Sequence, residues 1–506
     1  MSSPQLAAKP SNSTSASLDT ALPVVIVGGG FVGLFTALHL RHRHYPNPVI
    51  LIDSQTQFVF KPLLYEYLSG EMEATEVVPT YEELLSGSDI TFVQGSVTEV
   101  DLTERKVRLA AGLQYSYQYL VLAVGSIQGY FGTEGAQQYA FAFRTQADAQ
   151  RLKEQLRDRL QAASQTADSV ERKKLATVAI VGAGPSGVEM AATLADLLPG
   201  WYAKLGGKPQ DIRVVLVNHG DSILSGDVNE HLQETALAAL KKRTVPVELL
   251  LGVGVEAVSA EGLSYRPKGE NSKEEQQQEK NALQQLSAAT VIWTAGTGTN
   301  PLIESLHLEP CDRDKHKSPL VMPTLQLLNY PDVFAAGDCA VVQAQPQPAV
   351  AQIAYQQGAG IAHNLLALAK GQSLKPVHPK MRGTLMKLGI RNGVANLFDK
   401  VQIEGEAGDL IRNATYLEML PTPIHNFKAT AEWLRDDTFE RHQKVGKIRR
   451  DRTSASHAQP LQPGRVAVWM SGAVLLASIV IGLFLGLGPQ RSPVPSARNS
   501  QPSKVE

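Results

Sequence analysis

The chain of 506 residues is too long for a single hydrophobic core, so we expect two or three domains. Its formal net charge of −1 argues against a nucleic acid as the partner. The two cysteines, Cys311 and Cys339, form no CxxC motif and are too few for a disulfide framework, which suits a reducing compartment.

The N-terminal residues 1–20 are rich in Ser, Thr, Ala and Pro. They predict a disordered tail rather than a signal or transit peptide. From Val24 to Leu38, four branched apolar residues are followed by a glycine cluster and an Ala/Leu-rich segment. This pattern predicts a buried strand, a tight turn and the start of a helix.

The glycines of this turn have the spacing of a dinucleotide-binding motif. Gly28 permits the turn, Gly30 lets the backbone approach a pyrophosphate, and Gly33 lets the helix pack close to the strand. The next predicted strand ends at Asp53, where a carboxylate can accept the hydroxyls of an adenosine ribose. A glycine turn in an ordinary α/β domain is the alternative, but strand, helix and acid together favour a dinucleotide.

Residues 58–72 form an aromatic, proline-containing stretch that we expect to be a loop covering a flat ring system, with core packing as the alternative. Residues 90–101 and 106–112 predict an antiparallel meander, and 117–126 a buried strand that ends in Gly125. Thr145 and Asp148 predict the N-terminal cap of a helix, and a linker follows at 166–174.

The glycine pattern returns at residues 176–198, with Gly182, Gly184 and Gly187 between a strand and a helix. Two such motifs predict one site for a flavin nucleotide and one for a nicotinamide nucleotide. The strand after the second motif ends in Asn218, where the first has Asp53. A carboxylate repels a 2′-phosphate and a neutral amide tolerates it, so we expect both NADH and NADPH to bind.

Residues 266–285 are polar and of low complexity, and predict a solvated loop between two strands. Residues 289–301 predict another buried strand, with Gly296 at its exit, and Asp338 follows a further strand. Residues 349–371 then predict a helix on which Gln352 and Gln356 share one face near the N-terminal end. Two exposed glutamines on a surface helix are the alternative.

Residues 466–487 contain no charge and are long enough to cross a bilayer, so they predict one transmembrane helix, with a buried core helix as the alternative. More Lys and Arg residues precede this segment than follow it, which predicts that the bulk of the chain lies on the cytoplasmic side. Residues 426–450 could also bind a membrane surface on their own.

The paired glycine motifs, "YLVLAVGS", "VFAAGD" and "AQIAYQQG" together resemble the type II NAD(P)H dehydrogenases, and "FKPLLYEYLSGEM" is similar to the loop of their cyanobacterial and chloroplast members. The resemblance implies an α/β fold with two Rossmann-like domains of the two-dinucleotide-binding flavoprotein type. It places the FAD-binding domain at 21–145 and 301–378, the NAD(P)H-binding domain at 146–300 and a membrane-proximal region at 379–450.

The resemblance also implies roles for individual residues. The residues expected to bind FAD are Gly28, Gly30, Gly33, Asp53 and Asp338. Those expected on the NAD(P)H side are Gly182, Gly184, Gly187 and Glu189, and those at the junction of flavin and quinone are Ala351, Gln352 and Gln356. Asn218 departs from the acid of the strictly NADH-using members and is a cofactor-binding candidate by its place at the strand end. Pro62, Gly125 and Gly296 are further cofactor-binding candidates. Lys61 is expected to tune the flavin or the quinone, with a solvated lysine as the alternative.

The implied activity is the transfer of a hydride from NAD(P)H to FAD, followed by the transfer of two electrons to a membrane quinone without proton pumping. The quinone is expected to be a plastoquinone or a naphthoquinone. No metal is required. The alternatives are a demethylnaphthoquinone-type reductase of quinone biosynthesis, a membrane-bound flavin redox sensor and, less favoured because its cysteine pattern is missing, a sulfide:quinone reductase. The expected partners are the lipid bilayer of a thylakoid or plasma membrane and, as an open alternative, a second copy of the chain in a homodimer.

Overall fold

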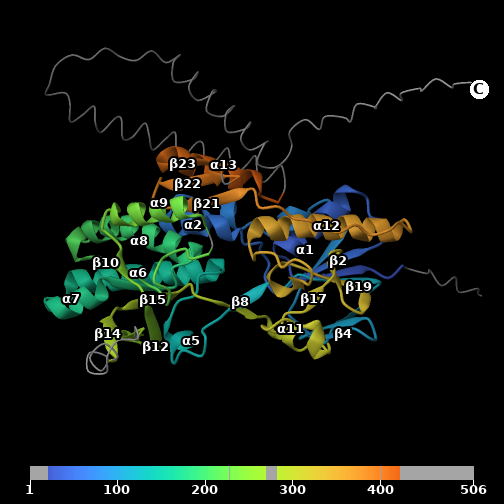
Figure 1. Cartoon of the computed structure of the whole chain (residues 1–506), viewed down its shortest axis with the longest axis horizontal. Coiled ribbons are helices and arrows are strands. Elements are labelled where there is room, and N and C mark those ends of the chain that lie inside the picture. The colour runs from blue at the N-terminus through green and yellow to red at the C-terminus, as the bar shows by residue number, and fades with distance from the viewer. Residues whose placement is uncertain (1–20, 227, 269–281, 399, 422–506) are drawn as a thin grey trace, which may run out of the picture. The chain divides into compact units, whose positions relative to one another are not determined.

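A computed structural model describes residues 21–226, 228–268, 282–398 and 400–421 (Figure 1). The predicted tail at 1–20, most of the low-complexity loop and the predicted membrane span at 466–487 lie outside these ranges. Within them, no helix is long and apolar enough to cross a membrane.

The chain forms two compact units. Among the described residues, the first unit comprises those within 21–55, 87–125 and 300–378, and the second comprises those within 56–86, 126–299 and 379–421. This division differs from the predicted one, because 56–86 and 126–145 group with the second unit. The reason is packing, since the helix at Leu64–Ser69 contacts helices of that unit.

The first unit is built on an eight-stranded sheet in the order β20-β17-β18-β19-β7-β1-β2-β3. Five adjacent strands are parallel: β19 (Tyr330–Ala335), β7 (Tyr119–Leu122), β1 (Val24–Val27), β2 (Val49–Asp53) and β3 (Ile90–Gln94). Beyond β19 follow three short strands, β18 (Gln326–Leu327), β17 (Leu320–Val321) and, at the edge, β20 (Val341–Val342). Every residue of β1 is buried, as expected of a strand with both faces covered.

Helices α1 (Phe31–His42) and α12 (Ala351–Ala369) pack along each other beside this sheet (Figure 1). A separate antiparallel meander contains β4 (Val97–Asp101), β5 (Lys106–Leu109) and β6 (Gln114–Ser116). The prediction that 90–101 belongs wholly to a meander is wrong in its first half, because β3 pairs in parallel with β2. The unit also contains α11 (Pro301–Glu304), η3 (Pro310–Asp312) and η4 (Gly337–Cys339).

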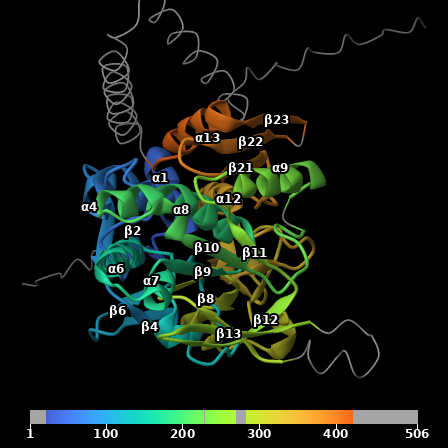
Figure 2. The same ribbon diagram turned by 90° about the vertical axis from the view of Figure 1, so that its left-hand side faces the viewer.

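The second unit has a four-stranded parallel sheet in the order β11-β10-β9-β15 (Figure 2). Its strands are β11 (Glu248–Leu250), β10 (Arg213–Val217), β9 (Thr177–Val181) and β15 (Thr290–Trp293). An antiparallel sheet contains β12 (Val253–Ser259), β13 (Gly262–Pro267) and β14 (Gln284–Ser287), and β8 (Ser126–Gln128) pairs with β16 (Thr297–Thr299).

Alternate residues of β9 explain how this sheet is covered. Val178 and Ile180 belong to a core shared with the helices, while Ala179 and Val181 belong to a core shared with β12, β13 and β14. Successive side chains of a strand point to opposite faces, so one sheet is packed on both sides. The helices of the unit are α2 (Leu64–Ser69), α3 (Ala74–Val77), α4 (Tyr81–Leu85), α5 (Ala136–Tyr139), α6 (Gln146–Gln165), α7 (Ser169–Leu175), α8 (Pro185–Lys204) and α9 (Glu230–Lys241), with η1 (Lys61–Leu63) and η2 (Pro209–Asp211).

The C-terminal part of the second unit is a three-stranded antiparallel sheet covered by one helix. It contains β21 (Gly383–Lys387), β22 (Gly393–Leu397), β23 (Val401–Glu404) and α13 (Gly405–Glu418). Both α8 and α13 contact β21. This module therefore packs directly on the helix that follows the second glycine motif.

Two local predictions need correction. Residues 58–72 are not an irregular loop, because they form η1 and α2, and Phe58, Phe60 and Tyr65 are buried. Residues 166–174 are not a linker, because Asp168 caps α7 by accepting hydrogen bonds from Val170 N and Glu171 N. The predicted cap of α6 is confirmed, since Thr145 and Asp148 form a complete capping box.

Candidate functional site

The first glycine turn is closed by backbone contacts except at Gly30. Gly28 has a φ of +100°, and a Cβ there would overlap the carbonyl of Ala123 in the first unit. A Cβ at Gly33 would overlap the carbonyl oxygen of Gly28, whereas one at Gly30 would meet no atom within 4 Å. Gly30 also caps α1 without a side-chain hydrogen bond. The turn thus leaves open space at the N-terminus of a helix, which suits a phosphate.

Asp53 stabilises this turn from the end of β2. Its Oδ2 accepts a hydrogen bond from Gly29 N at 2.6 Å, and its Oδ1 accepts one from Gln55 N at 2.8 Å. Each carboxylate oxygen can accept a second hydrogen bond. Asp53 can therefore hold the turn and a ribose hydroxyl at the same time.

Other predicted residues of the first unit lie on segments next to this turn. Gly125 has a φ of +61° after β7, and Asp338 is exposed on η4. The η4 turn is fixed by Gly337 N, which donates to Gln357 Oε1 at 2.8 Å. A Cβ at Gly337 would lie 2.9 Å from Val32 Cγ2, so η4 packs on the first turn of α1.

The first turn of α12 carries the predicted junction residues. Ala351 is its first residue, and the N-cap Val350 has no side-chain hydrogen bond. Gln352 and Gln356 are both half-buried, and Gln356 Nε2 donates to the Gln352 carbonyl at 2.8 Å. The side chain of Gln356 is therefore held along the helix.

The two cysteines are both free and differ in environment. Cys311 is exposed, while Cys339 is completely buried and donates to the carbonyls of Ala336 and Leu122. Burial raises the pKa of the Cys339 thiol to about 11. A neutral thiol is a poor nucleophile, so neither geometry nor ionisation suits disulfide chemistry at this residue.

The second glycine turn has the same construction within the second unit. Gly182 has a φ of +104°, and a Cβ there would lie 2.8 Å from Ala295 N. A Cβ at Gly187 would overlap the carbonyl oxygen of Gly182. Gly184 caps α8 without a side-chain hydrogen bond, and Pro185 is the first helical residue. The N-terminus of α8 therefore also has backbone N–H groups without a capping side chain.

Asn218 occupies the place that Asp53 has in the first unit. Its Oδ1 accepts a hydrogen bond from Ala183 N at 3.2 Å, just as Asp53 accepts one from Gly29 N. Its Nδ2 donates both hydrogens, to Gly220 O at 3.2 Å and Ser222 O at 2.9 Å. The loop after β10 is thus built around an amide, since a carboxylate could not donate to these two carbonyls.

Gly296 follows β15 with a φ of +72°, and a Cβ there would overlap the ring of Phe131. Phe131 is 76% exposed, although it is a large apolar side chain. Glycine is therefore required at 296 both by the backbone and by the aromatic ring above it.

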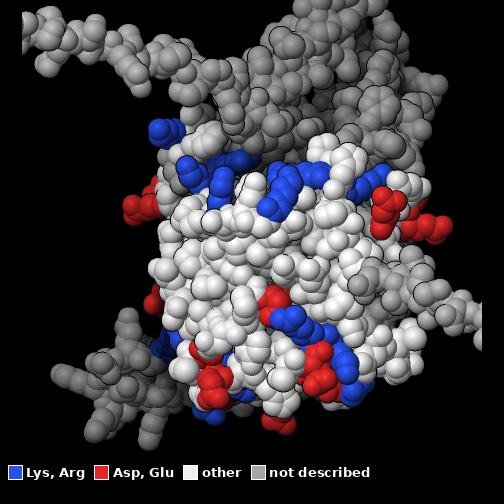
Figure 3. All heavy atoms as spheres, turned by 90° about the vertical axis from the view of Figure 1, so that its right-hand side faces the viewer, with Lys and Arg blue, Asp and Glu red and all other residues white. Residues whose placement is uncertain are grey.

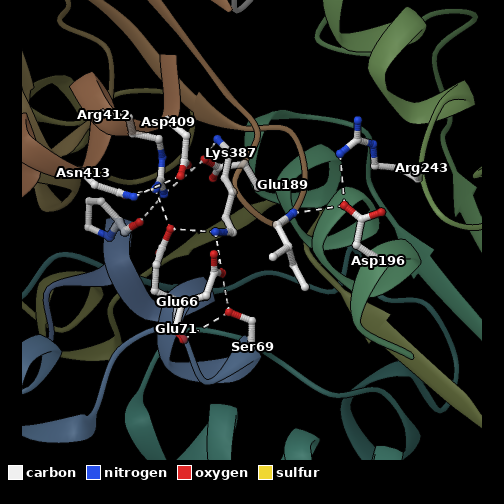
Figure 4. A network of polar contacts seen from close by, with 12 residues as sticks. Glu66, Ser69, Glu71, Glu189, Asp196, Arg243, Lys387, Asp409, Arg412 and Asn413 are labelled. Atoms are coloured by element: carbon white, nitrogen blue, oxygen red, sulfur yellow. Dashed lines mark hydrogen bonds and ion pairs between the residues drawn. The ribbon is translucent and has the colours of Figure 1, made fainter. Parts of the chain in front are cut away.

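A buried charge network lies elsewhere in the second unit (Figure 4). Lys387 Nζ, at the end of β21, contacts Glu66 Oε1 at 3.0 Å and Glu71 Oε2 at 2.7 Å. Arg412 of α13 contacts Glu66 Oε1 at 2.6 Å and lies 3.8 Å from Glu189 Oε1. Lys387 and Arg412 are fully buried. We call Glu66, Glu71, Glu189, Lys387, Asp409 and Arg412 the buried charge cluster.

Predicted residues from two segments meet this cluster. Glu189, on α8, accepts a hydrogen bond from Lys387 N at 2.9 Å. The carbonyl of Pro62 accepts one from Arg412 Nη2 at 2.7 Å, so Pro62 contacts the cluster through its backbone. Lys61 is the first residue of η1 and is half-buried.

Burial and neighbouring charges divide the carboxyls of the cluster into two kinds. Burial alone would raise the pKa of Glu66, but Arg412 and Lys387 lower it, so Glu66 is ionised. Burial raises the pKa of Glu189 to about 7 and that of Asp409 to about 6, against the opposing effect of the same cations. Glu189 can therefore hold or release a proton near neutral pH, which is the property required of a general acid or base.

Sequence reasoning missed Glu66, Glu71, Lys387, Asp409 and Arg412. The available signal was weak: Lys387 interrupts the apolar run of 383–390, and Arg412 lies beside Ile411 in a short helix. A charged residue within an apolar pattern indicates a buried partner but does not identify it.

The geometry fits the nucleotides that the resemblance implies. In the first unit, open space at Gly30, an uncapped helix and the Asp53 carboxylate fit the pyrophosphate and ribose of FAD. In the second unit, the uncapped N-terminus of α8 and the neutral Asn218 fit a nicotinamide nucleotide.

Comparisons with known proteins agree with this geometry. Residues 22–358 match the model of the pyridine nucleotide-disulphide oxidoreductases, so the chain belongs to that family. An alternative NAD(P)H-ubiquinone oxidoreductase of Arabidopsis thaliana is 30% identical, with 81% of this chain and 80% of the relative covered. A demethylphylloquinone reductase of Synechocystis is also 30% identical, with 81% of this chain and 95% of the relative covered.

Within the family, these relatives confirm the predicted membership of the type II NAD(P)H dehydrogenases. The structure of NDH2 from Plasmodium falciparum in complex with NADH shares the fold, with a TM-score of 0.72 at 18% identity over 82% of this chain and 98% of that one. The predicted class of enzyme, an FAD-dependent NAD(P)H:quinone oxidoreductase, is thereby confirmed. The roles of individual residues stay predictions.

Proposed function

We propose that this protein oxidises both NADH and NADPH and reduces a quinone dissolved in a membrane. The net reaction consumes one proton: NAD(P)H, H⁺ and quinone yield NAD(P)⁺ and hydroquinone. When bound, FAD supplies the two-electron chemistry that links the two substrates. The observation that carries the choice of nucleotide is the neutral Asn218 at the end of β10, hydrogen-bonded to Ala183 N.

The protein's own groups have distinct tasks in this proposal. Asp53 and the N-terminus of α1 hold one nucleotide, and Asn218 and the N-terminus of α8 hold the other. Glu189 holds a proton at its carboxyl near neutral pH, because burial raises its pKa to about 7. Lys387 N and the Arg412 guanidinium keep that carboxyl in place in either protonation state.

The test of nucleotide choice replaces Asn218 by Asp. We expect the NADPH:NADH ratio of kcat/KM with a short-chain quinone to fall tenfold to a hundredfold, or about 1–3 kcal/mol, because the new carboxylate repels a 2′-phosphate. Asn229→Asp is the control, since Asn229 caps α9 and an aspartate serves equally well there. An unchanged ratio in Asn218→Asp, or a wild type that rejects NADPH, would refute the assignment of Asn218 to the ribose.

A second candidate is reduction of a demethylnaphthoquinone in quinone biosynthesis. It is supported by the Synechocystis relative, which is named demethylphylloquinone reductase and is covered over 95% of its length. Comparing kcat/KM for a demethylnaphthoquinone and a benzoquinone of equal chain length separates the candidates. A preference of tenfold or more for the naphthoquinone would favour the biosynthetic role.

The proposal also includes attachment to the membrane through residues 466–487, with the two units on the cytoplasmic side. It is supported by the uncharged length of that segment and by the cations at 444–465 that precede it.

A further inference from the structure

A patch of positive charge lies in the first unit where α1 and α12 end. The end of α1 carries Arg41, His42 and Arg43, and Lys370 is the C-cap of α12. Arg43 Nη1 lies 3.4 Å from Nδ1 of His363, which belongs to α12. We call Arg41, Arg43, Lys370 and Lys375 the cationic patch, and the His363 ring lies among these cations. Figure 3 views the side of the molecule at the right of Figure 1 and shows Lys and Arg gathered in a band along its upper part.

The segment after α12 is fixed in a way that places Lys375 in the patch. Asn364 is completely buried, and its Oδ1 accepts from Lys375 N at 2.9 Å. Its Nδ2 donates to the Lys375 carbonyl at 2.9 Å and to that of Thr324 at 3.1 Å. Val377 fills the space beside Gly360. The backbone that carries Lys375 is thus held against α12 before any partner binds.

The charges of the patch are close enough to affect one another. The pKa of His363 lies below its usual value because of partial burial and because Lys375, Arg43 and Lys370 repel its protonated form. A helix C-terminus attracts one or two cations through its partial negative charge. The cations of the patch are more numerous than the one or two that a helix C-terminus attracts.

The chain segments that carry the patch contain no carboxylate. No Asp or Glu occurs from Ala21 to Ile52 or from Cys339 to Phe398, although the chain has 49 of them. Arg43, Lys370 and Lys375 have no ion-pair partner among the described residues. Cations of the β4–β6 meander differ, since Arg108 and Lys106 are paired with Glu99 and Glu104. Such segregation leaves a surface that attracts an anion.

We propose that the cationic patch is a docking surface for the anionic headgroups of a lipid bilayer. This inference rests on the proposed membrane attachment and adds a second contact, made by the folded first unit. The cations at 444–465 have the same sign as the patch, so an anionic leaflet attracts both. Each Lys or Arg near such a surface strengthens binding roughly fivefold, and the effect falls off within a Debye length.

The test uses the full chain with Leu476→Arg and Ile479→Arg, which prevent insertion of the predicted span. Flotation measures its partition onto phosphatidylcholine vesicles with and without phosphatidylglycerol. We expect Arg43→Gln with Lys375→Gln to lower partition onto the anionic vesicles roughly tenfold or more and to make it less dependent on salt. The control, Lys106→Gln with Arg108→Gln, removes the same charge from the meander and should change partition less than about twofold.

Equal losses of partition in the two double variants, the patch variant and the meander control, would overturn the proposal. A second measurement keeps the native span: a fluorophore at His44→Cys, in a Cys311→Ser background, should be quenched by headgroup quenchers in anionic vesicles more than one at Glu104→Cys. Equal quenching in neutral and anionic vesicles would also overturn the proposal. So would a fluorescence change at residue 44 that occurs without lipid and is lost when the acidic residues Asp436 and Asp437 are replaced, because the patch would then bind the chain itself. NAD(P)H oxidation by a short-chain quinone tests the proposed function separately on each preparation, because no patch residue lies in the catalytic machinery.

Discussion

Glu189 shows how the environment of one residue sets its chemistry. It lies on α8, where its carboxylate accepts a hydrogen bond from Lys387 N, and Arg412 Nη2 lies 3.8 Å from its Oε1. Glu66 shares the same two cations but contacts both directly, at 3.0 Å and 2.6 Å. One carboxyl is therefore ionised, while the pKa of the other rises to about 7.

Glu189→Gln should change how stability depends on pH. The folded-state pKa of about 7 exceeds the unfolded value, so the carboxyl contributes stability that is fully present below about pH 4.5 and is lost as pH rises through 7. Glutamine keeps the acceptor for Lys387 N and does not ionise. We expect equal thermal midpoints for the two proteins at about pH 4. At pH 8 we expect a higher midpoint for the variant, with a free energy of unfolding that is larger by up to about 3 kcal/mol. Curves that stay parallel from pH 5 to 8 would contradict the raised pKa.

The two thiols should react very differently with an alkylating agent. Cys311 is exposed, whereas Cys339 is buried with its pKa raised to about 11. We expect one thiol per native chain to react with iodoacetamide at pH 8 and two in guanidinium, as counted by mass spectrometry of peptides. The control is Cys311→Ser, which should be unreactive until it is unfolded. Rapid native labelling of Cys339 would show that the thiol is accessible.

At the scale of the element, the two glycines of the first turn should separate folding from binding. Gly33→Ala places a Cβ against the carbonyl oxygen of Gly28, so α1 must move from β1. Gly30→Ala meets no protein atom, and the φ of −69° at residue 30 suits any residue. We expect Gly33→Ala to lose several kcal/mol of stability, by analogy with overpacked cores at about 1–3 kcal/mol or more.

Gly30→Ala should leave the apoprotein within about 0.5 kcal/mol of wild type and yet purify with little FAD, because the methyl group occupies the place of the pyrophosphate. Flavin absorbance per chain and urea unfolding of the apoproteins measure both effects. A Gly30→Ala protein with a full complement of flavin would refute the cofactor position.

The C-terminal module should depend on the buried charge cluster. Lys387→Met leaves Glu66 and Glu71 without their shared cation, and removing one partner of a buried pair costs about 3–5 kcal/mol. Arg108→Met is the matched control, because its partner Glu99 is half exposed and such pairs contribute about 0–1 kcal/mol. Urea unfolding at pH 7 compares the two. Equal losses would show that the cluster does not stabilise the module.

At the scale of the whole molecule, truncation before Arg465 should separate attachment from catalysis. The described residues of both units end at residue 421, N-terminal to that point. We expect the shortened chain to be attached more weakly to the membrane and to keep most NAD(P)H oxidation with a soluble quinone. Retention at high salt, which weakens binding through the cationic patch, would point to residues 426–450 as a second anchor. Loss of bound flavin would instead show that the C-terminal residues are part of the fold.

The sequence by itself determined the two nucleotide-binding turns. Each depends on a strand, a glycine turn and a helix that are contiguous in the chain, and on one residue at the end of the next strand. Backbone overlap permits only glycine at residues such as Gly33 and Gly187, so the requirement is visible in the residues themselves. The same locality explains why the cap at Thr145 and Asp148 was predicted correctly.

Only the tertiary structure decided the buried charge cluster and the conformation of residues 58–72. Glu66, Glu189, Lys387 and Arg412 come from four segments far apart in the chain, and each charge is tolerated in the interior only because the others are there. Residues 64–69 are helical because α2 packs on α6 and α8. No local pattern encodes such partners, since burial brings them together only after the chain has folded.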